Sequence, residues 1–287
     1  MSYQIDLGII GGTGIYQMSG VTIIEKLSID TPFGKPSSPL IIADVNGKTI
    51  AFLARHGEGH SIPPSEINYR ANIYALKSLG VKSVVGISAC GSLREDYAPG
   101  NIVIPDQIID FSKNRERTFF GSGLVAHISA ADPFCPHLSK LLYEAVNQET
   151  SRVVNGGTLI TIEGPRFSTK AESHLFRSWG ISIIGMTTSP EIFLAREAEM
   201  CYASFAHVTD YDVWHINEEP VTVDMILKVL HQNSVAANEA LLNLINQYEP
   251  YECSCHHALA NALTTNSAFI DPEKKETLKL LVGKYLN

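Results

Sequence analysis

The segment Thr209-Asp-Tyr-Asp212 places two carboxylates one residue apart, directly after the apolar run 201–208. If that run is a buried strand, the carboxylates lie at its C-terminal end, where open α/β sheets hold ligands. Burial favours a neutral carboxyl group, so a buried Asp210 can donate a hydrogen bond near neutral pH. A donor beside an acceptor suits N7 and the 6-amino group of a purine. The same residues fit equally well a polar turn with Asp210 as a local cap.

Two other apolar runs end in residues that suit anions. The run 7–10 leads into Gly11-Gly-Thr-Gly14, whose backbone N–H groups and Thr13 hydroxyl could approach a small anion. A dinucleotide fingerprint is excluded because, counting from Gly12, Gln17 stands at the third glycine position. The run 50–54 ends at Arg55-His56, where Arg offers a planar fork of donors suited to phosphate and His56 adds another donor.

Small polar residues follow two more apolar runs. Ser88 and Ala89 come after 81–87, where they leave room for a ligand and present N–H and hydroxyl donors. Thr187 comes after 181–186 and precedes Ser189-Pro-Glu191, a cap, N1 and first-turn pattern that predicts a helix start. Agreement in chemistry among several strand ends is much less probable by chance than any one of them, and it predicts an anion site.

A sheet has to bring these residues together. The pattern predicts an α/β fold with a single domain over residues 1–287 and a tail from about 250 with weak helical signals. Predicted strands cover 7–10, 50–54, 81–87, 101–105, 158–162, 181–186 and 201–208, and predicted helices cover 65–79, 136–148, 190–200 and 222–247. Residues 111–135 are predicted to be irregular.

Composition excludes several classes of protein. A net charge of −8 argues against nonspecific nucleic-acid binding. The N-terminus has no basic segment, and no apolar run approaches the ~18 residues of a membrane span, so we expect a cytoplasmic protein that binds no membrane. Cys253-Ser-Cys255 suggests zinc, but no second ligand pair stands at a structural-zinc spacing. We therefore expect no metal, and a redox-sensitive or structural Cys-x-Cys.

Together these residues resemble the trimeric purine nucleoside phosphorylase superfamily and, within it, the 5′-methylthioadenosine phosphorylase family. The resemblance spans roughly residues 7–247. It rests on serial blocks, which are more specific than any lone motif: 8–14, 31–37, 53–57, 68–73, 89–95, 162–168, 186–191 and 209–212.

The resemblance implies one α/β domain around a mixed, twisted sheet flanked by helices. It also implies a homo-oligomer, a trimer with a hexamer as the alternative. The implied reaction is attack of inorganic phosphate on C1′ of methylthioadenosine in purine and methionine salvage, with phosphate as co-substrate and no cofactor. The alternative is a broader or 6-oxopurine phosphorylase acting on adenosine, inosine, guanosine or methylthioinosine. Gly185 stands where the family usually has Asn, which leaves the breadth of specificity open.

The resemblance also implies roles by position. Asp210, Arg55 and His56 are expected to be catalytic. The expected phosphate-binding residues are Thr13, Arg55, His56, Ser88, Ala89 and Thr187. The expected nucleoside-binding residues are Phe167, Met186, Asp210, Tyr211, Asp212, Val223, Ile226 and Leu227, with His127 reaching a neighbouring subunit's site. Ser168 and Val223 are expected to set substrate preference.

Overall fold

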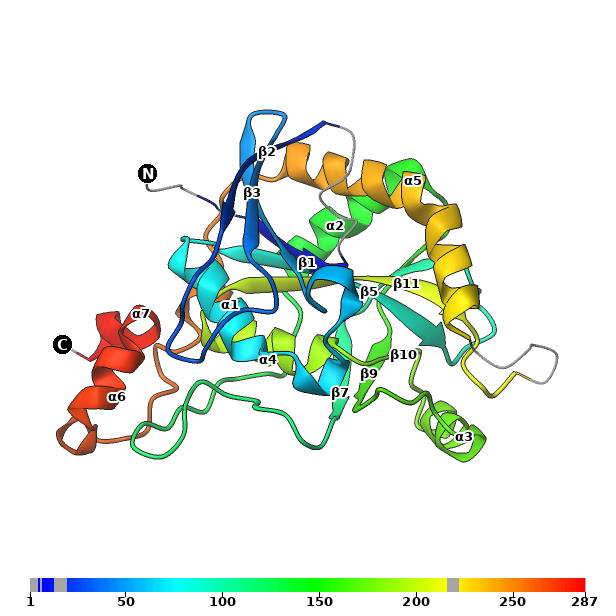
Figure 1. The fold of residues 1–287 in the computed structure, drawn as a ribbon. Coiled ribbons are helices and arrows are strands. Elements are labelled where there is room, and N and C mark those ends of the chain that lie inside the picture. The colour runs from blue at the N-terminus through cyan, green and yellow to red at the C-terminus, as the bar shows by residue number, and fades with distance from the viewer. Residues whose placement is uncertain (1–4, 6, 13–19, 216–221, 287) are drawn as a thin grey trace.

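The computed structural model describes residues 5, 7–12, 20–215 and 222–286. Among these residues eleven strands form one mixed sheet with helices on both faces (Figure 1). The strands are β1 Leu7–Gly11, β2 Val21–Leu27, β3 Leu40–Val45, β4 Lys48–Ala54, β5 Ser83–Ser92, β6 Ile102–Ile104, β7 Gln107–Phe111, β8 Val153–Asn155, β9 Thr158–Ile162, β10 Ile183–Gly185 and β11 Cys201–Asp210.

The helices are α1 Tyr69–Ser78, α2 Pro136–Glu149, α3 Lys170–Ser178, α4 Thr188–Glu197, α5 Val223–Gln247, α6 Pro272–Thr277 and α7 Lys279–Val282. Short 3₁₀ turns occupy Glu58–His60, Pro64–Glu66, Ser254–His257, Ser267–Phe269 and Gly283–Tyr285. Among the described residues, no helix has the length and apolar character that crossing a bilayer would require.

Strand β5 organises the sheet. Its first half pairs in parallel with β1, its whole length pairs in parallel with β11, and its end pairs antiparallel with β10. The order along one path is β2-β3-β4-β1-β5-β10-β9-β7, while β11 leaves β5 toward β6 and β8. Because β1, β4, β5 and β11 all run parallel, their carboxyl ends meet at one edge of the sheet.

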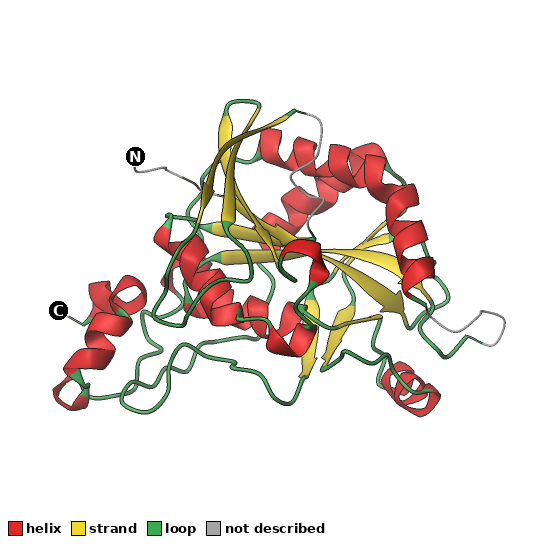
Figure 2. Cartoon of the chain, viewed as in Figure 1, coloured by secondary structure: helices red, strands yellow, loops and turns green. Residues whose placement is uncertain are grey.

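Two apolar layers cover the sheet (Figure 2). Helices α1 and α4 pack on one face through residues such as Ile73, Leu76 and Leu194. Helices α2 and α5 pack on the other face through residues such as Leu142 and Leu241. Every residue of β11 is buried, as expected of a central strand covered on both faces. The predicted mixed α/β class with flanking helices is therefore confirmed.

Several elements differ from the prediction. Helix α1 begins after Asn68, whose side chain accepts from the Ala71 N–H, because Ile67 is extended. Strands β2, β3, β7 and β8 and helix α3 were not predicted. Helix α3 starts with a capping box, in which Thr169 and Glu172 each accept from the other's backbone N–H.

The tail after α5 packs against the domain. Glu199 is buried just before β11, and its carboxylate accepts from the Leu259 N–H at 3.1 Å and from the Tyr285 hydroxyl at 2.5 Å. Lys284 Nζ lies 2.6 Å from the same carboxylate. Three tail residues therefore hold a carboxylate that would be costly to bury without partners.

Candidate active site

The shared edge of the parallel strands collects most of the predicted residues. Arg55 follows β4, and its backbone N–H donates to Gly11 O at the end of β1. Ser88 and Ala89 lie half-buried in β5, in register with residues of β11. Strand β10 arrives from the other side, where a Cβ added at Gly185 would lie 3.9 Å from Ala89 O. The ends of β1 and β4 thus lie at the same edge as the second half of β5, which pairs with β11 and β10.

Arg55 is a buried cation at this edge of the sheet. It is 2% exposed, and its Nε and Nη2 each donate at 2.8 Å to the carboxylate of Glu191, which is 0% exposed. Its remaining contacts are to carbonyls, with Nη1 donating to Ile87 O at 2.7 Å and Nη2 to Ile10 O at 3.3 Å. Burial acts to lower the pKa of Arg55, but the charge and hydrogen bonds of Glu191 outweigh it and raise that pKa.

This arrangement limits the donors that Arg55 can offer to phosphate, and its predicted contact with phosphate stays a prediction. The fork expected to face phosphate is bound to Glu191 in α4, so only one Nη1 hydrogen remains for another acceptor. The Tyr202 hydroxyl also donates to Glu191, at 2.7 Å. Glu191 was read from sequence only as a helix-start residue. A buried arginine that ends an apolar strand needs a carboxylate partner, and that need was the signal for Glu191.

His56 uses one ring nitrogen for a neighbouring carbonyl, and its predicted contact with phosphate stays a prediction. Its Nδ1 lies 2.9 Å from Ile62 O, and because a carbonyl only accepts, Nδ1 carries the proton. Burial lowers the pKa of His56 to about 4, with Arg55 and His60 adding to the effect. The ring, which stacks on His60 at 4.2 Å, is therefore neutral at pH 7 and presents Nε2 as an acceptor.

Asp210 ends β11 and is 7% exposed. Its Oδ2 lies 2.7 Å from the Thr209 hydroxyl, which also lies 3.2 Å from Cys90 O, and its Oδ1 accepts from the Asp212 N–H at 2.8 Å. Burial raises the pKa of Asp210 to about 6, although the bonds from Thr209 and Asp212 oppose this. Asp210 is therefore a buried acid that titrates near neutrality.

Asp212 lies beside Asp210 with a left-handed backbone, φ 51°. Burial raises the pKa of Asp212, while the nearby Ser173 and Ser168 hydroxyls lower it. Among the described residues, Asp212 Oδ2 and the two serine oxygens are buried without a hydrogen bond of normal geometry. Such a cluster is poised to accept a polar ligand, because unmade buried hydrogen bonds are costly.

The other residues predicted to bind the base and ribose lie on three segments. Met186 follows β10, with its sulfur beside Gly164. Phe167 is 37% exposed, so part of it is open to solvent. Tyr211 lies between the two acids in sequence and stacks on His215, with ring centres 4.7 Å apart. Their predicted contacts with nucleoside stay predictions.

Thr187 is buried between β10 and α4. Its backbone takes the cap position of α4, but no side chain caps the helix. The predicted cap, Ser189, is extended inside that segment, and its hydroxyl has no partner among the described residues. The sequence therefore predicted the place of the helix start but not its capping.

The structure does not place the remaining predicted residues at the strand ends. Thr13 lies outside the described residues, as do the side chains of Val223 and Leu227 in the first turns of α5. Ile226 is half-buried on the same helix. His127 is exposed and its backbone N–H donates to Ala262 O in the tail, away from the strand ends.

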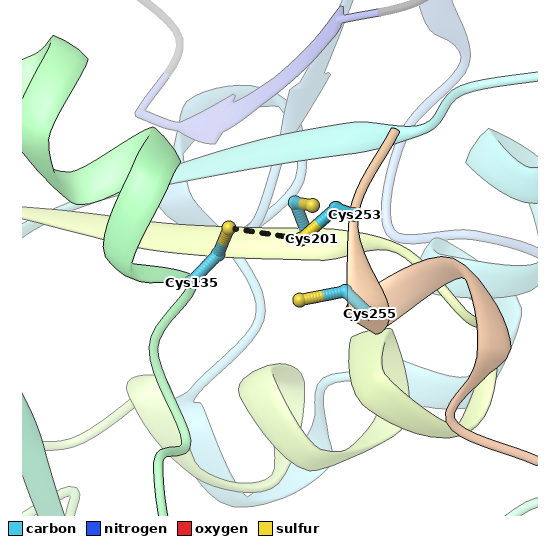
Figure 3. A group of neighbouring side chains, drawn as sticks. All are labelled: Cys135, Cys201, Cys253 and Cys255. Carbon is cyan, nitrogen blue, oxygen red and sulfur yellow. Dashed lines mark hydrogen bonds between the residues drawn. The ribbon is translucent and has the colours of Figure 1, made fainter. Parts of the chain in front are cut away.

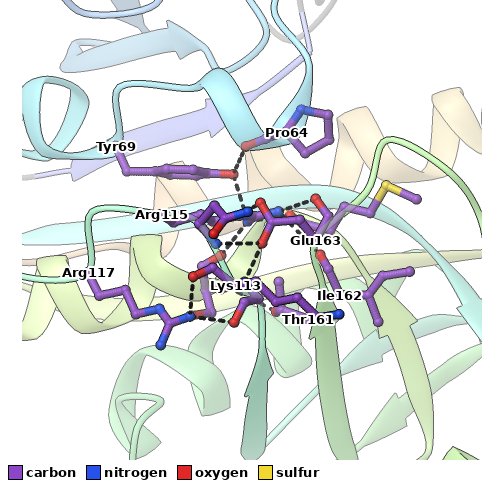
Figure 4. A network of polar contacts seen from close by, with 12 residues as sticks. Pro64, Tyr69, Lys113, Arg115, Arg117, Thr161, Ile162 and Glu163 are labelled. Atoms are coloured by element: carbon purple, nitrogen blue, oxygen red, sulfur yellow. Dashed lines mark hydrogen bonds and ion pairs between the residues drawn. The ribbon is translucent and has the colours of Figure 1, made fainter.

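Arg115 is a residue whose role the sequence did not reveal (Figure 4). Its side chain is 1% exposed and lies 3.3 Å from the Glu163 carboxylate. Its two Nη groups also donate to the Tyr69 hydroxyl and to four backbone carbonyls: those of Ile162 and Glu163 at the end of β9, and those of Met186 and Ser189 between β10 and the start of α4. One guanidinium thus ties together the two loops that carry Phe167 and Met186.

We expect Arg115→Lys to destabilise the fold by about 2–4 kcal/mol, because a point ammonium cannot reach this set of acceptors and leaves several buried carbonyls unpaired. Urea unfolding measures the loss. Arg117→Lys is the matched control, because Arg117 is 45% exposed and binds loop carbonyls nearby. Equal effects of the two substitutions would show that Arg115 does not organise these loops.

Comparison with known proteins adds an independent observation. The sequence model of the Phosphorylase superfamily matches residues 6–246. The S-methyl-5′-thioadenosine phosphorylase of Koribacter versatilis is 46% identical, over 98% of this chain and 97% of its own length. The enzyme of the same name from Geobacter sulfurreducens is 47% identical, over 98% of this chain and 99% of its own length.

Solved structures agree with this. A methylthioadenosine phosphorylase from an Antarctic soil metagenomic library superposes with a TM-score of 0.91 at 45% identity, covering 96% of this chain and 98% of that one. The Schistosoma mansoni methylthioadenosine phosphorylase in complex with adenine gives a TM-score of 0.84 at 38% identity, over 89% and 96%. With the fold, the strand-end site and these similarities in agreement, the chain belongs to the phosphorylase superfamily.

Proposed function

We propose that this protein catalyses phosphorolysis of 5′-methylthioadenosine, giving adenine and 5-methylthioribose 1-phosphate. The observation that carries the proposal is Asp210, a buried acid with a pKa of about 6 at the C-terminal end of a central strand. An acid of this kind can donate to N7 of a leaving purine. Asp212, whose buried Oδ2 makes no hydrogen bond of normal geometry in the described part of the chain, supplies the acceptor that a 6-amino group needs.

The reaction needs charge stabilised at two places. As the bond from C1′ to N9 breaks, positive charge develops on the ribose and negative charge on the purine. Phosphate held at the carboxyl-end edge of the sheet, beside β5, attacks C1′ and stabilises the positive charge on the ribose. Hydrogen-bond donation from Asp210 to N7 stabilises the negative charge on the purine, and the glycosidic electron pair leaves with adenine. No covalent intermediate on the protein is required.

The phosphate subsite is proposed to form around Ser88, Ala89, Thr187 and His56. A neutral His56 presents Nε2 as an acceptor, so it suits a phosphate oxygen that still carries its proton. Arg55 is proposed to act on phosphate through its charge and its remaining Nη1 hydrogen, while its donations to Ile10 O in β1 and Ile87 O in β5 hold it beside the subsite. Thr13 is proposed to complete the subsite.

A broader substrate range is the second candidate, and Gly185 favours it. As a glycine, residue 185 offers no side-chain amide to select the purine edge, and a Cβ added there would meet, in the described part of the chain, only Ala89 O within 4 Å. Selection between adenine and a 6-oxopurine then depends on Asp210 and Asp212. Adenosine, inosine and methylthioinosine are the substrates that test this.

The assembly is proposed to be a homotrimer, with a hexamer as the alternative, in which His127 reaches a neighbouring subunit's site. The exposure of His127, away from the strand ends of its own chain, supports that role. We also propose a cytoplasmic enzyme of purine and methionine salvage, without a cofactor in catalysis.

An activity panel tests the proposed function. Methylthioadenosine, adenosine, inosine and methylthioinosine are each incubated with and without phosphate, and free base and sugar phosphate are quantified by chromatography. We expect adenine release from methylthioadenosine only with phosphate, and the highest kcat/KM for that substrate. Adenine release without phosphate would indicate a hydrolase, and faster turnover of the 6-oxopurines would favour the alternative. Heat-inactivated protein is the control.

A further inference from the structure

Four cysteines from three separate segments meet at one point beside the first residue of β11 (Figure 3). Cys135 precedes α2, Cys201 is the first residue of β11, and Cys253 and Cys255 lie in the tail. Cys135, Cys201 and Cys255 are buried and Cys253 is half-buried. All four sulfur atoms lie within 4.8 Å of one another.

This spacing matches a tetrahedral metal site. A zinc–sulfur bond of about 2.3 Å in a tetrahedron places neighbouring sulfurs about 3.8 Å apart. The Cys135 and Cys253 sulfurs are 3.7 Å apart. Disulfides would draw the sulfurs together in twos, whereas here every sulfur is near the other three. A set of four mutually close thiols is the arrangement of a closed structural zinc site.

Groups around the cluster would orient the ligands and offset their charge. Zinc displaces four thiol protons to solvent, and the resulting tetrathiolate complex carries a net charge of about −2. Arg196 Nη1 donates to the Cys255 sulfur at 3.3 Å, and its Nη2 is fixed by Pro133 O at 3.3 Å. The Tyr251 hydroxyl lies 3.7 Å from the Cys135 sulfur, and His256 Nε2 lies 3.6 Å from that of Cys201. Such outer contacts are typical of metal-bound thiolates.

We infer that this protein binds one Zn(II) ion through Cys135, Cys201, Cys253 and Cys255. The sequence led us to expect no metal, because Cys253-Ser-Cys255 has no partner pair nearby in the chain. The fold supplies that pair from α2 and β11. All four positions of the ion are filled by protein, so the site is structural, and its role is to fasten the tail to the start of the central strand.

The site is independent of the proposed reaction. Cys201 and Asp210 are the two ends of β11, which at about 3.3 Å per residue separates them by roughly 30 Å. The metal therefore contacts neither phosphate nor nucleoside. A failure of the zinc proposal leaves the proposed phosphorolysis untouched, and the reverse also holds.

Metal analysis of the full-length, untagged protein tests the inference. The protein is produced in zinc-supplemented medium and purified with a reductant and without chelator. We expect about one zinc per chain by mass spectrometry of the elements, released stoichiometrically when a mercurial reagent titrates the thiols. Because this titration uses the unaltered protein, it does not depend on a variant that folds.

Two tail variants and one control locate the site. Cys253→Ser and Cys255→Ser should each lower the bound zinc at least about 10-fold, since the loss of one thiolate opens a closed site. Cys90→Ser is the matched control, because Cys90 is a buried cysteine outside the cluster and should leave the zinc content unchanged. Reconstitution with Co(II) should give the absorption bands of tetrahedral thiolate coordination in the unaltered protein and lose them in both tail variants.

Three results would overturn the inference. The first is reduced protein with all its thiols free and less than about 0.1 metal per chain. The second is an intact mass lower by two or four hydrogens, which would show that the cluster forms disulfides. The third is full zinc content in both tail variants.

Discussion

Replacing Asp210 with Asn should lower kcat/KM for methylthioadenosine by about 10²–10⁴-fold, the usual worth of a positioned general acid. An amide can still donate a hydrogen bond to N7, but it cannot transfer a proton as the purine leaves. The isosteric Asn can keep the contacts with Thr209 and the Asp212 N–H. The loss should therefore be greater for adenine nucleosides than for inosine, and equal losses would make Asp210 structural.

The pH dependence gives a second readout of the same group. The pKa of Asp210 is raised by burial from 3.8 to about 6, so the neutral form is abundant below pH 6 and is lost as the pH rises. If the neutral acid is the donor, kcat/KM should fall as the pH rises through about 6. Phosphate also titrates near neutrality. The fall in kcat/KM that belongs to Asp210 is therefore identified by comparing the pH profiles of the unaltered protein and Asp210→Asn. That fall in kcat/KM should be absent from Asp210→Asn. An identical fall in the variant would contradict the assignment to Asp210.

A neutral Asp210 also has a place for its proton before substrate binds. Thr209 carries a single hydroxyl proton and lies within hydrogen-bond distance of both Asp210 and Cys90 O. Thr209 can donate to Cys90 O while it accepts from the neutral acid. Asp96→Asn is the control for the Asp210 substitution, because Asp96 is 62% exposed and bound to Arg94 at the surface. Its kcat/KM should equal that of the unaltered protein.

Glu191→Gln should destabilise the protein by about 3–5 kcal/mol, because it leaves the buried Arg55 without its counter-charge. Both carboxylate oxygens of Glu191 bind Arg55, and one of them also accepts from Tyr202. Urea unfolding at a fixed protein concentration gives the free energy. Thermal unfolding should show a midpoint lower by on the order of 10 °C.

The double variant Arg55→Met/Glu191→Met separates pairing from packing. If the loss in Glu191→Gln comes from an unpaired buried charge, removing both charges should restore much of the stability. Glu144→Gln is the surface control, because Glu144 lies 3.8 Å from Lys140 on the exposed side of α2. This substitution should change the free energy of unfolding by less than about 0.5 kcal/mol. A double variant less stable than Glu191→Gln would contradict this account of the pair.

The sequence predicted the strands that carry the site, because each is a short apolar run closed by Gly, Ser, Thr, Arg or Asp. It failed where the signal was weak or absent. Strand β2 is largely exposed, so it shows no buried alternation, and β8 has only three residues. Helix α3 did have a readable signal, the Thr169-x-x-Glu172 capping box.

The candidate site shows a similar limit. The positions of Arg55, Asp210 and Asp212 follow from the pattern, but their partners do not. Glu191 meets Arg55 across a long stretch of chain, and the proton position of His56 depends on Ile62 O. The cysteine cluster is also a product of the fold alone. The residue types at the end of each strand can be recognised in the sequence, whereas contacts between distant segments cannot.

The buried Glu199 has a consequence for how the domain is made. It stands directly before the central strand, yet the groups that satisfy its carboxylate, on Leu259, Lys284 and Tyr285, leave the ribosome long after that strand. Domains fold as units while synthesis proceeds from the N-terminus. The sheet can therefore collapse early, but this carboxylate stays unsatisfied until the tail docks. Translation halted after α5 would yield a chain that contains the whole matched superfamily region, residues 6–246, and still lacks the groups that satisfy Glu199.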